Sequence, residues 1–258
     1  MLAIILGSLV GLSLGLTGGG GSIFAVPLLV YGLQLDFRQA VALSLAIVGA
    51  TALFGAVLQA RTGLVLWGAG AVLGLGGILT APLGAYVGRR LPDDLSILMF
   101  AGLMAFIGAK MLSGRNDLTA STFVCPKNAR GQLTFSWTCA LKLLATGMAA
   151  GILSGIFGVG GGFLIVPALL LVTGISIERA MGTSLVSIAL ISLSGFASNI
   201  SSLSTDTLAV AWTFFGGALL GMTAGTMIKS YLSAKILRKI FGAMILATAV
   251  AVVIATLT

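Results

Sequence analysis

The sequence predicts an all-α, polytopic membrane protein with two homologous halves, each of about four transmembrane helices and each beginning with a Gly-rich broken or re-entrant helix. The first observation behind this prediction is the composition. Of the 258 residues, 58% are hydrophobic and 8% are charged, and the mean hydropathy is +1.16. A soluble domain carries about 25% charged residues, so this chain cannot cover a water-facing surface. The other observations are a series of long apolar segments and a repeated Gly-rich motif.

Long apolar segments follow one another along the chain. A helix needs about 20 apolar residues to cross the hydrocarbon core, and the segments of about that length are 39–60, 64–88, 95–112, 138–156, 180–200, 207–228 and 236–257. Two shorter segments, 22–34 and 163–174, follow Gly-rich breaks, and residues 2–16 precede the first break. A helix of about 13 residues reaches only about 20 Å. Each break is therefore expected to separate two partial or tilted segments.

One polar stretch, residues 113–137, divides the chain near its middle. We interpret it as a solvated loop between repeats. The predicted organisation is a first transmembrane repeat over 1–112, the inter-repeat loop over 113–137 and a second transmembrane repeat over 138–258. Cys125 and Cys139 are expected to be free thiols, unless the loop faces an oxidising compartment and they pair.

The two halves repeat each other. A shift of 140 residues aligns Gly7/Gly147, Gly11/Gly151, Gly15/Gly155, Gly18/Gly158, Gly20/Gly160, Gly21/Gly161, Pro27/Pro167 and Ser44/Ser184. With one extra residue in the second half, Gly84 also meets Gly225. Chance matches of Gly, Pro and Ser are rarer than those of Leu and Ala, so we infer an internal duplication. Duplicated halves with broken helices are typical of membrane transporters.

The composition also excludes several functions. The chain has no His and only six acidic residues, which rules out a His-based catalytic triad and gives no cluster for a transition metal. We therefore expect no enzymatic activity, no metal and no cofactor. The net charge of +8 comes from basic residues spread over loops, where anionic lipids and topology explain them better than nucleic acid does.

The strongest functional signal is the pair of Gly-rich segments, GLTGGGGSIFAVP from Gly15 and GIFGVGGGFLIVP from Gly155. Glycine at this density breaks a helix, and irregular backbone survives at membrane depth only inside protein or beside a polar cavity. Each segment precedes a short apolar helix, whose N-terminus offers N–H donors and a positive dipole end to an anion. We expect the two segments to meet near the bilayer midplane and to cradle an anionic group.

Close helix packing is the alternative explanation for glycine. We favour packing for the outer glycines at positions 7, 11 and 15 and at 147, 151 and 155, because small residues four apart let transmembrane helices approach. The central clusters contain more glycines than packing requires, so for them we favour a role in substrate binding or gating.

Polar side chains inside the apolar segments complete the candidate site. Gln59 and Asn199 align near the end of corresponding segments, where an amide needs a partner; ligand contact and a bond between helices are equally compatible. Arg61 could attract an anion or extend to the interface. The candidate substrate-binding residues are Gly18, Gly19, Gly20, Gly21, Ser22, Ser44, Gln59, Arg61, Gly158, Gly160, Gly161, Gly162, Thr183, Ser184 and Asn199. Glu178 and Arg179 are interpreted as a solvated loop pair, and Lys229 as part of the last loop.

The relative orientation of the repeats stays open at this point. If each broken pair counts as one span, each half has four spans and the repeats are parallel. If each piece crosses separately, each half has five spans and the repeats are inverted. Counting Lys and Arg in the loops does not distinguish the two arrangements.

The pattern resembles the sulfite exporter TauE/SafE family, also called the toluene sulfonate uptake permease family. The resemblance is carried by the doubled Gly-rich segment with its apolar run and Pro, by ALSL at 42–45 and GTSL at 182–185, and by QARTGLV at 59–65. It covers almost the whole chain except 113–137. Ser201 stands where a second-half match to Arg61 would be, so a mechanism that needs a symmetric Arg pair does not fit.

The resemblance implies a multi-pass protein of a prokaryotic inner membrane that transports sulfite, organosulfonates or related sulfur-containing anions. We expect a secondary transporter working in the direction of export, with alternating access between the repeats and the anion at the paired Gly-rich loops. An anion channel and an uptake permease for another organic anion are the alternatives. The expected partners are a small anionic substrate and the lipid bilayer, with a homodimer left open.

Overall fold

The computed structural model describes residues 1–112, 137–157, 162–202, 205–229 and parts of 231–250. All regular elements in these ranges are helical. They are α1 (Leu2–Thr17), α2 (Gly21–Pro27), the π-helical turn η1 (Leu28–Gly32), α3 (Phe37–Ala60), α4 (Trp67–Gly88), α5 (Asp93–Leu112), α6 (Trp137–Phe157), α7 (Gly162–Thr173), α8 (Ile177–Asn199), the 3₁₀ turn η3 (Ile200–Ser202) and α9 (Thr205–Lys229). Most of the predicted polar loop, and the chain end from residue 251, lie outside the described residues.

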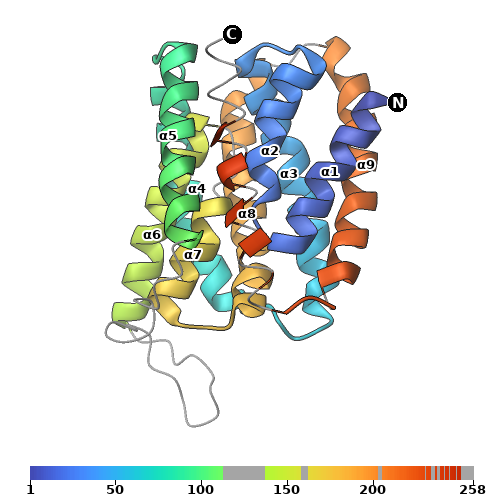
Figure 1. Cartoon of the computed structure of the whole chain (residues 1–258). Helices are drawn as coiled ribbons and strands as arrows, with labels where there is room; N and C mark the ends of the chain where they lie inside the picture. Colours follow the sequence, from blue (N-terminus) through green and yellow to red (C-terminus); the bar gives the residue numbers. More distant parts are fainter. Residues whose placement is uncertain are drawn as a thin grey trace.

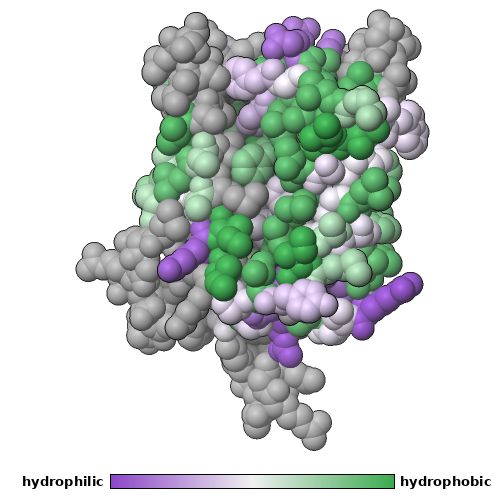
Figure 2. All heavy atoms as spheres, turned by 45° about the vertical axis from the view of Figure 1, so that its right-hand side comes forward, coloured by the Kyte–Doolittle hydropathy of each residue, from purple (hydrophilic) through white to green (hydrophobic). Residues whose placement is uncertain are grey.

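Several described helices have the length and composition of membrane spans, which confirms the prediction of an all-α multi-pass membrane protein. They cover Phe37–Ala60, Trp67–Gly88, Trp137–Phe157, Ile177–Asn199 and Val210–Lys229. Figure 2 shows hydrophobic atoms gathered in a broad band, with most hydrophilic atoms on this face toward the two ends. Such a band is what the hydrocarbon core requires of the protein surface.

The helices associate as pairs that are distant in sequence. The helix α1 packs along α9, and α4 packs along α6, while α3 and α8 pack against each other. Figure 1 shows α1 beside α9 on one side of the bundle and α4 beside α6 on the other. The helices α3 and α8 have the most buried span windows, at 67% and 61% of their residues, so they form the interior of the bundle.

Glycine makes the two outer helix pairs possible. A Cβ atom added at Gly11 of α1 would overlap the backbone of Ala218 in α9, coming within 2.8 Å of its Cα. A Cβ atom at Gly151 of α6 would likewise come within 2.6 Å of Gly77 Cα in α4. Small residues thus bring the backbones into direct contact, which confirms the packing role expected for the outer glycines.

The helix α1 ends where the first Gly-rich segment begins. Gly18 caps it in the left-handed conformation, with φ of 71°, and its N–H bonds to Leu14 O. The short helix α2 then starts at Gly21. Pro27 removes a backbone donor from it, and the chain continues through the π-helical turn η1.

One cysteine expectation was wrong. Cys139, in the first turn of α6, is buried and disulfide-bonded rather than a free thiol. Cys125 lies outside the described residues.

Candidate functional site

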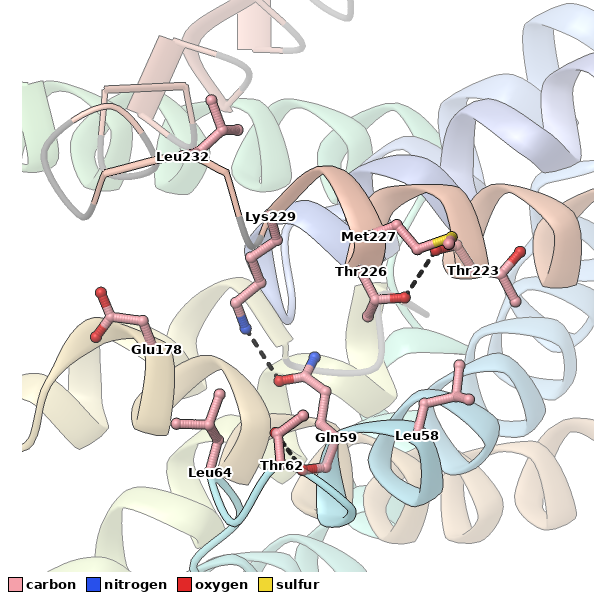
Figure 3. Close-up of a pocket in the computed structure, with 10 residues that line it drawn as sticks. All are labelled: Leu58, Gln59, Thr62, Leu64, Glu178, Thr223, Thr226, Met227, Lys229 and Leu232. Carbon is pink, nitrogen blue, oxygen red and sulfur yellow. Dashed lines mark hydrogen bonds between the residues drawn. The ribbon is translucent and has the colours of Figure 1, made fainter.

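A cavity of about 610 Å³ opens at one end of the bundle, where the end of α3, the start of α8 and the end of α9 meet. Figure 3 shows its walls. They are formed by Leu58, Gln59, Thr62, Leu64, Glu178, Thr223, Thr226, Met227, Lys229 and Leu232. Cavities of this size are typical of small-molecule sites, and here an apolar wall surrounds a few polar groups.

Lys229 is the cation of this cavity. It is the last residue of α9, and its side chain is only 8% exposed. Its Nζ donates a hydrogen bond to Gln59 Oε1 over 3.0 Å, joining α9 to the end of α3 (Figure 3). The assignment of Lys229 to a loop was therefore wrong, because the helix continues to this residue and the neighbouring helices cover it.

Gln59 has a second polar atom that the protein leaves unused. The residue is 5% exposed, and its Nε2 is buried without a hydrogen-bond partner. A buried amide N–H without an acceptor destabilises a protein by about 1–3 kcal/mol. An unpaired donor of this kind, on the wall of a cavity, marks a place where a ligand acceptor would be stabilised.

Glu178 brings a negative charge to the same cavity. It lies in the first turn of α8, half-buried, and close enough to Lys229 for the two charges to interact. Its interpretation as part of a solvated loop pair was incomplete, since it lines the cavity as well. The cavity thus contains an ammonium, a carboxylate and an amide donor within an apolar wall.

A second, much smaller cavity of about 20 Å³ lies where the start of α3 meets the ends of α4 and α8. Asn199 lines it, and the Asn199 Nδ2 donates to Gly195 O over 2.8 Å. Two arginines tie the surrounding helices together. Arg38 Nη2 donates to Arg89 O over 3.3 Å, and Arg89 Nη1 donates to Ser198 O over 2.8 Å.

The first Gly-rich segment is buried in close backbone contacts. Gly20 N–H donates to Thr17 Oγ1 over 2.8 Å, and Ser22 Oγ donates to Gly19 O over 2.7 Å. Gly21 is the residue at which α2 packs back on α1, where a Cβ would overlap Leu14. Several polar groups of this segment are therefore satisfied within the segment itself.

The first segment touches the second half directly. A Cβ added at Gly162, the first residue of α7, would come within 2.7 Å of Gly19 O. Ser184 Oγ lies within hydrogen-bond distance of both Gly18 O and Met181 O. These contacts bring residues from the two predicted repeats together. Gly158, Gly160 and Gly161 lie outside the described residues.

The remaining predicted site residues lie apart from the large cavity. Ser44 is buried and bonds to Val41 O over 2.8 Å. Thr183 Oγ1 accepts the N–H of Leu66 over 3.0 Å. Arg61 caps the end of α3 and is exposed. Among the predicted residues that the structure describes, Gln59 is the one that lines the large cavity. Within the same ranges, no three His, Cys, Asp or Glu side chains gather as metal ligands would.

Sequence reasoning missed Lys229, the central residue of the cavity. It follows directly after the apolar run 207–228, which made it look like the start of a loop. The available signal was its alignment with the end of the corresponding apolar segment, since a shift of 141 residues places it on Gly88, the last residue of the predicted segment 64–88. A cation where the other predicted repeat has glycine is a local departure from the predicted duplication.

Comparison with known proteins agrees with the family resemblance of the sequence. The family described as "Sulfite exporter TauE/SafE" matches residues 3–252. A "Probable membrane transporter protein" of Xylella fastidiosa (strain 9a5c) is 34% identical over 252 residues, covering 96% of this chain and 92% of its own length. The "Probable membrane transporter protein YdhB" of Bacillus subtilis (strain 168) is 29% identical, covering 91% of this chain and 89% of its own. No solved structure matches.

Proposed function

Because the chain belongs to the sulfite exporter TauE/SafE family of membrane transporters, we propose that it is a secondary transporter that exports small sulfur-containing anions, such as sulfite or organosulfonates. In this proposal it works by alternating access between two inverted repeats. The observation that carries it is a pair of unequal cavities at equivalent positions of the two halves.

The two cavities share four aligned positions. These pairs are Gln59/Asn199, Glu178/Arg38, Thr226/Ala85 and Lys229/Gly88, related by shifts of 140 or 141 residues. One cavity has a volume of about 610 Å³ and the other about 20 Å³. A carrier built from two repeats reaches its substrate site from either end, and opens one access route while it closes the other. The difference in volume supports a state that is open at the Lys229 end and closed at the Asn199 end.

The helix contacts support the duplication on which this mechanism rests. The glycines of α1 face the α9 backbone in the pairs Gly7/Phe214, Gly11/Ala218 and Gly15/Met222, and those of α6 face α4 in the pairs Gly147/Leu73, Gly151/Gly77 and Gly155/Ala81. Adding 140 to each α1 glycine gives the α6 glycine, and subtracting 141 from each α9 partner gives the α4 partner. The two interfaces are thus related position by position.

The helix directions support the inverted arrangement. In Figure 1, α1 runs downward from the marked N-terminus, whereas its counterpart α6 runs upward from the lower left. The chain then turns back along α2 in the first half and along α7 in the second, in opposite senses. We propose that both Gly-rich segments form re-entrant hairpins, and that the Gly19–Gly162 contact is the place about which the halves move. Anion binding at the paired Gly-rich segments remains a prediction.

Flux measurements in proteoliposomes test the function. The purified protein is expected to give saturable uptake of labelled sulfite, accelerated by unlabelled sulfite on the opposite side, while chloride moves no faster than in protein-free liposomes. Acceleration by substrate on the far side is a property of carriers, because the loaded site returns by alternating access.

Other outcomes of this experiment are equally informative. Flux that rises linearly with concentration, together with an anion conductance, would identify a channel instead. Folded protein with no flux of sulfite, taurine or sulfoacetate would contradict transport of sulfur-containing anions.

A further inference from the structure

We infer that Lys229 and Gln59 form a binding site for the oxyanion head of a small organic anion, with the apolar wall of the same cavity holding the organic part. This inference rests on the proposed function, since it identifies where the transported anion first binds. It places that site at the open end of the bundle, in addition to the predicted position at the Gly-rich segments.

The donors of the site are incompletely used by the protein. An ammonium group has three protons to donate, and within the described part of the chain Lys229 Nζ donates to Gln59 Oε1. Gln59 Nε2 is buried with no acceptor at all. An ammonium proton and an amide N–H on neighbouring side chains of one cavity wall are the donors that a sulfonate or carboxylate head requires, and charge-assisted bonds of this kind are the stronger ones.

Burial of the cation also indicates a ligand site. A charge at the end of a membrane helix normally extends to water, but the Lys229 side chain is 8% exposed and points into the bundle toward Gln59. A buried charge is stabilised only by a partner of opposite charge or by several hydrogen bonds. An ionisable side chain covered in this way within a membrane protein indicates a functional site.

Glu178 limits the charge of the ligand. Glu178 lines the cavity together with Lys229, so a second negative charge on the ligand would be repelled by this carboxylate while the single ammonium offsets only one. A monovalent anion is therefore better matched than a divalent one. The leucines at 58, 64 and 232, together with Met227, supply apolar surface, which favours a ligand with a hydrocarbon body. Each CH₂ that this surface removes from water strengthens binding roughly threefold to fourfold.

Equilibrium binding to the purified full-length protein in detergent tests the site, with methanesulfonate, butane-1-sulfonate and sulfate as probes. Butane-1-sulfonate is expected to bind about tenfold or more tightly than methanesulfonate, and sulfate most weakly. Lys229→Met removes the cation, and Gln59→Glu replaces the amide donor by a carboxylate of the same shape. Each change is expected to weaken butane-1-sulfonate binding at least about tenfold.

Two controls keep the test decisive. Lys142→Met removes the same charge from an exposed position on α6 and is expected to leave binding unchanged. If Lys229→Met does not fold, the isosteric Gln59→Glu still tests whether the site binds the anion. Binding with unchanged affinity in Gln59→Glu would overturn the site, as would the absence of butane-1-sulfonate binding to the wild type.

Sulfite flux through the same variants separates this inference from the proposed function. If the wild type transports sulfite and Gln59→Glu transports it with the same KM, the site is overturned and the transporter proposal stays intact. If the wild type binds butane-1-sulfonate and Gln59→Glu does not, but the wild type gives no flux of any anion, the result would support the site and contradict the transporter.

Discussion

Whether a glycine of this protein is needed for helix packing depends on its exact position, as two neighbouring residues of α9 illustrate. Gly217 is buried where a Cβ would overlap the backbone of Ile4, coming within 3.0 Å of its carbonyl carbon, whereas Gly216 has nothing within 4 Å. Gly217→Leu should therefore force α9 away from α1 and lower the free energy of unfolding by about 2 kcal/mol, as overpacking does. A thermal melt in detergent checks this.

Gly216→Leu provides the matched control for that melt. It makes the same change one residue away on the same helix, and it should leave Tm unchanged or raise it slightly, since leucine favours a helix over glycine by roughly 0.5–1 kcal/mol. Equal effects of the two substitutions would show that the helix contact does not stabilise the protein.

Single residues also show where sequence reasoning reached its limit. Gln59 was identified from its alignment with Asn199, because an amide in an apolar segment is unfavourable without a partner. Lys229 was not, since its burial depends on how α3 and α8 cover the end of α9. Covering of that kind is a tertiary property, so the sequence indicates only that Lys229 aligns with the last residue of an apolar segment in the other half, not that it is buried. A cation at the end of an apolar run has the same appearance whether it is buried or solvated.

At the scale of elements, the apolar pattern predicted the helices closely. The segment 39–60 corresponds to Phe37–Ala60, 138–156 to Trp137–Phe157 and 207–228 to Thr205–Lys229. Bilayer thickness sets the length of a spanning helix, so hydropathy alone locates its ends within a few residues. The pairing of helices far apart in sequence was beyond this pattern, because lipid and a neighbouring helix accept the same apolar side chains.

Arg89 links the end of α4 to the end of α8. Its guanidinium links the end of α4 to Ser198 O near the end of α8, over the small cavity. Arg89→Ala should weaken closure at this end by about 1 kcal/mol, which is about a fivefold change in the open population. The measurement is the rate of maleimide labelling at Ala85→Cys, a buried position in the wall of that cavity.

Arg90 serves as the control for this linkage. It lies just after α4 and stacks over the ring of Tyr86 in that helix, with its guanidinium 4.4 Å from the ring centroid. Arg90→Ala should therefore leave the labelling rate of Ala85→Cys unchanged. An equal increase in both variants would mean that general loosening of α4, rather than loss of the link to α8, exposes the cavity.

For the whole molecule, alternating access predicts opposite changes at aligned positions. Thr226 lines the large cavity and Ala85, its counterpart, the small one. Thr226→Cys should react with a maleimide much faster than Ala85→Cys in the resting protein. A substrate anion that promotes exchange should slow the first reaction and speed the second. The parent protein, with its native cysteines, gives the background.

Changes in the same direction at both sites would contradict this mechanism. Faster labelling of both positions would indicate a continuous pore. Slower labelling of both would indicate that the anion simply compacts the protein, without an exchange of open ends.

The pairing of α1 with α9 has a consequence for biosynthesis. About 200 residues separate Gly7 from Phe214, its contact on α9. At roughly 5–20 residues per second, the ribosome needs about 10–40 s to produce that partner. Throughout this interval the glycine face of α1 has only lipid or an insertion factor against it. The helix α1 is thus made long before its packing partner, and assembly of this helix pair waits for the second half of the chain.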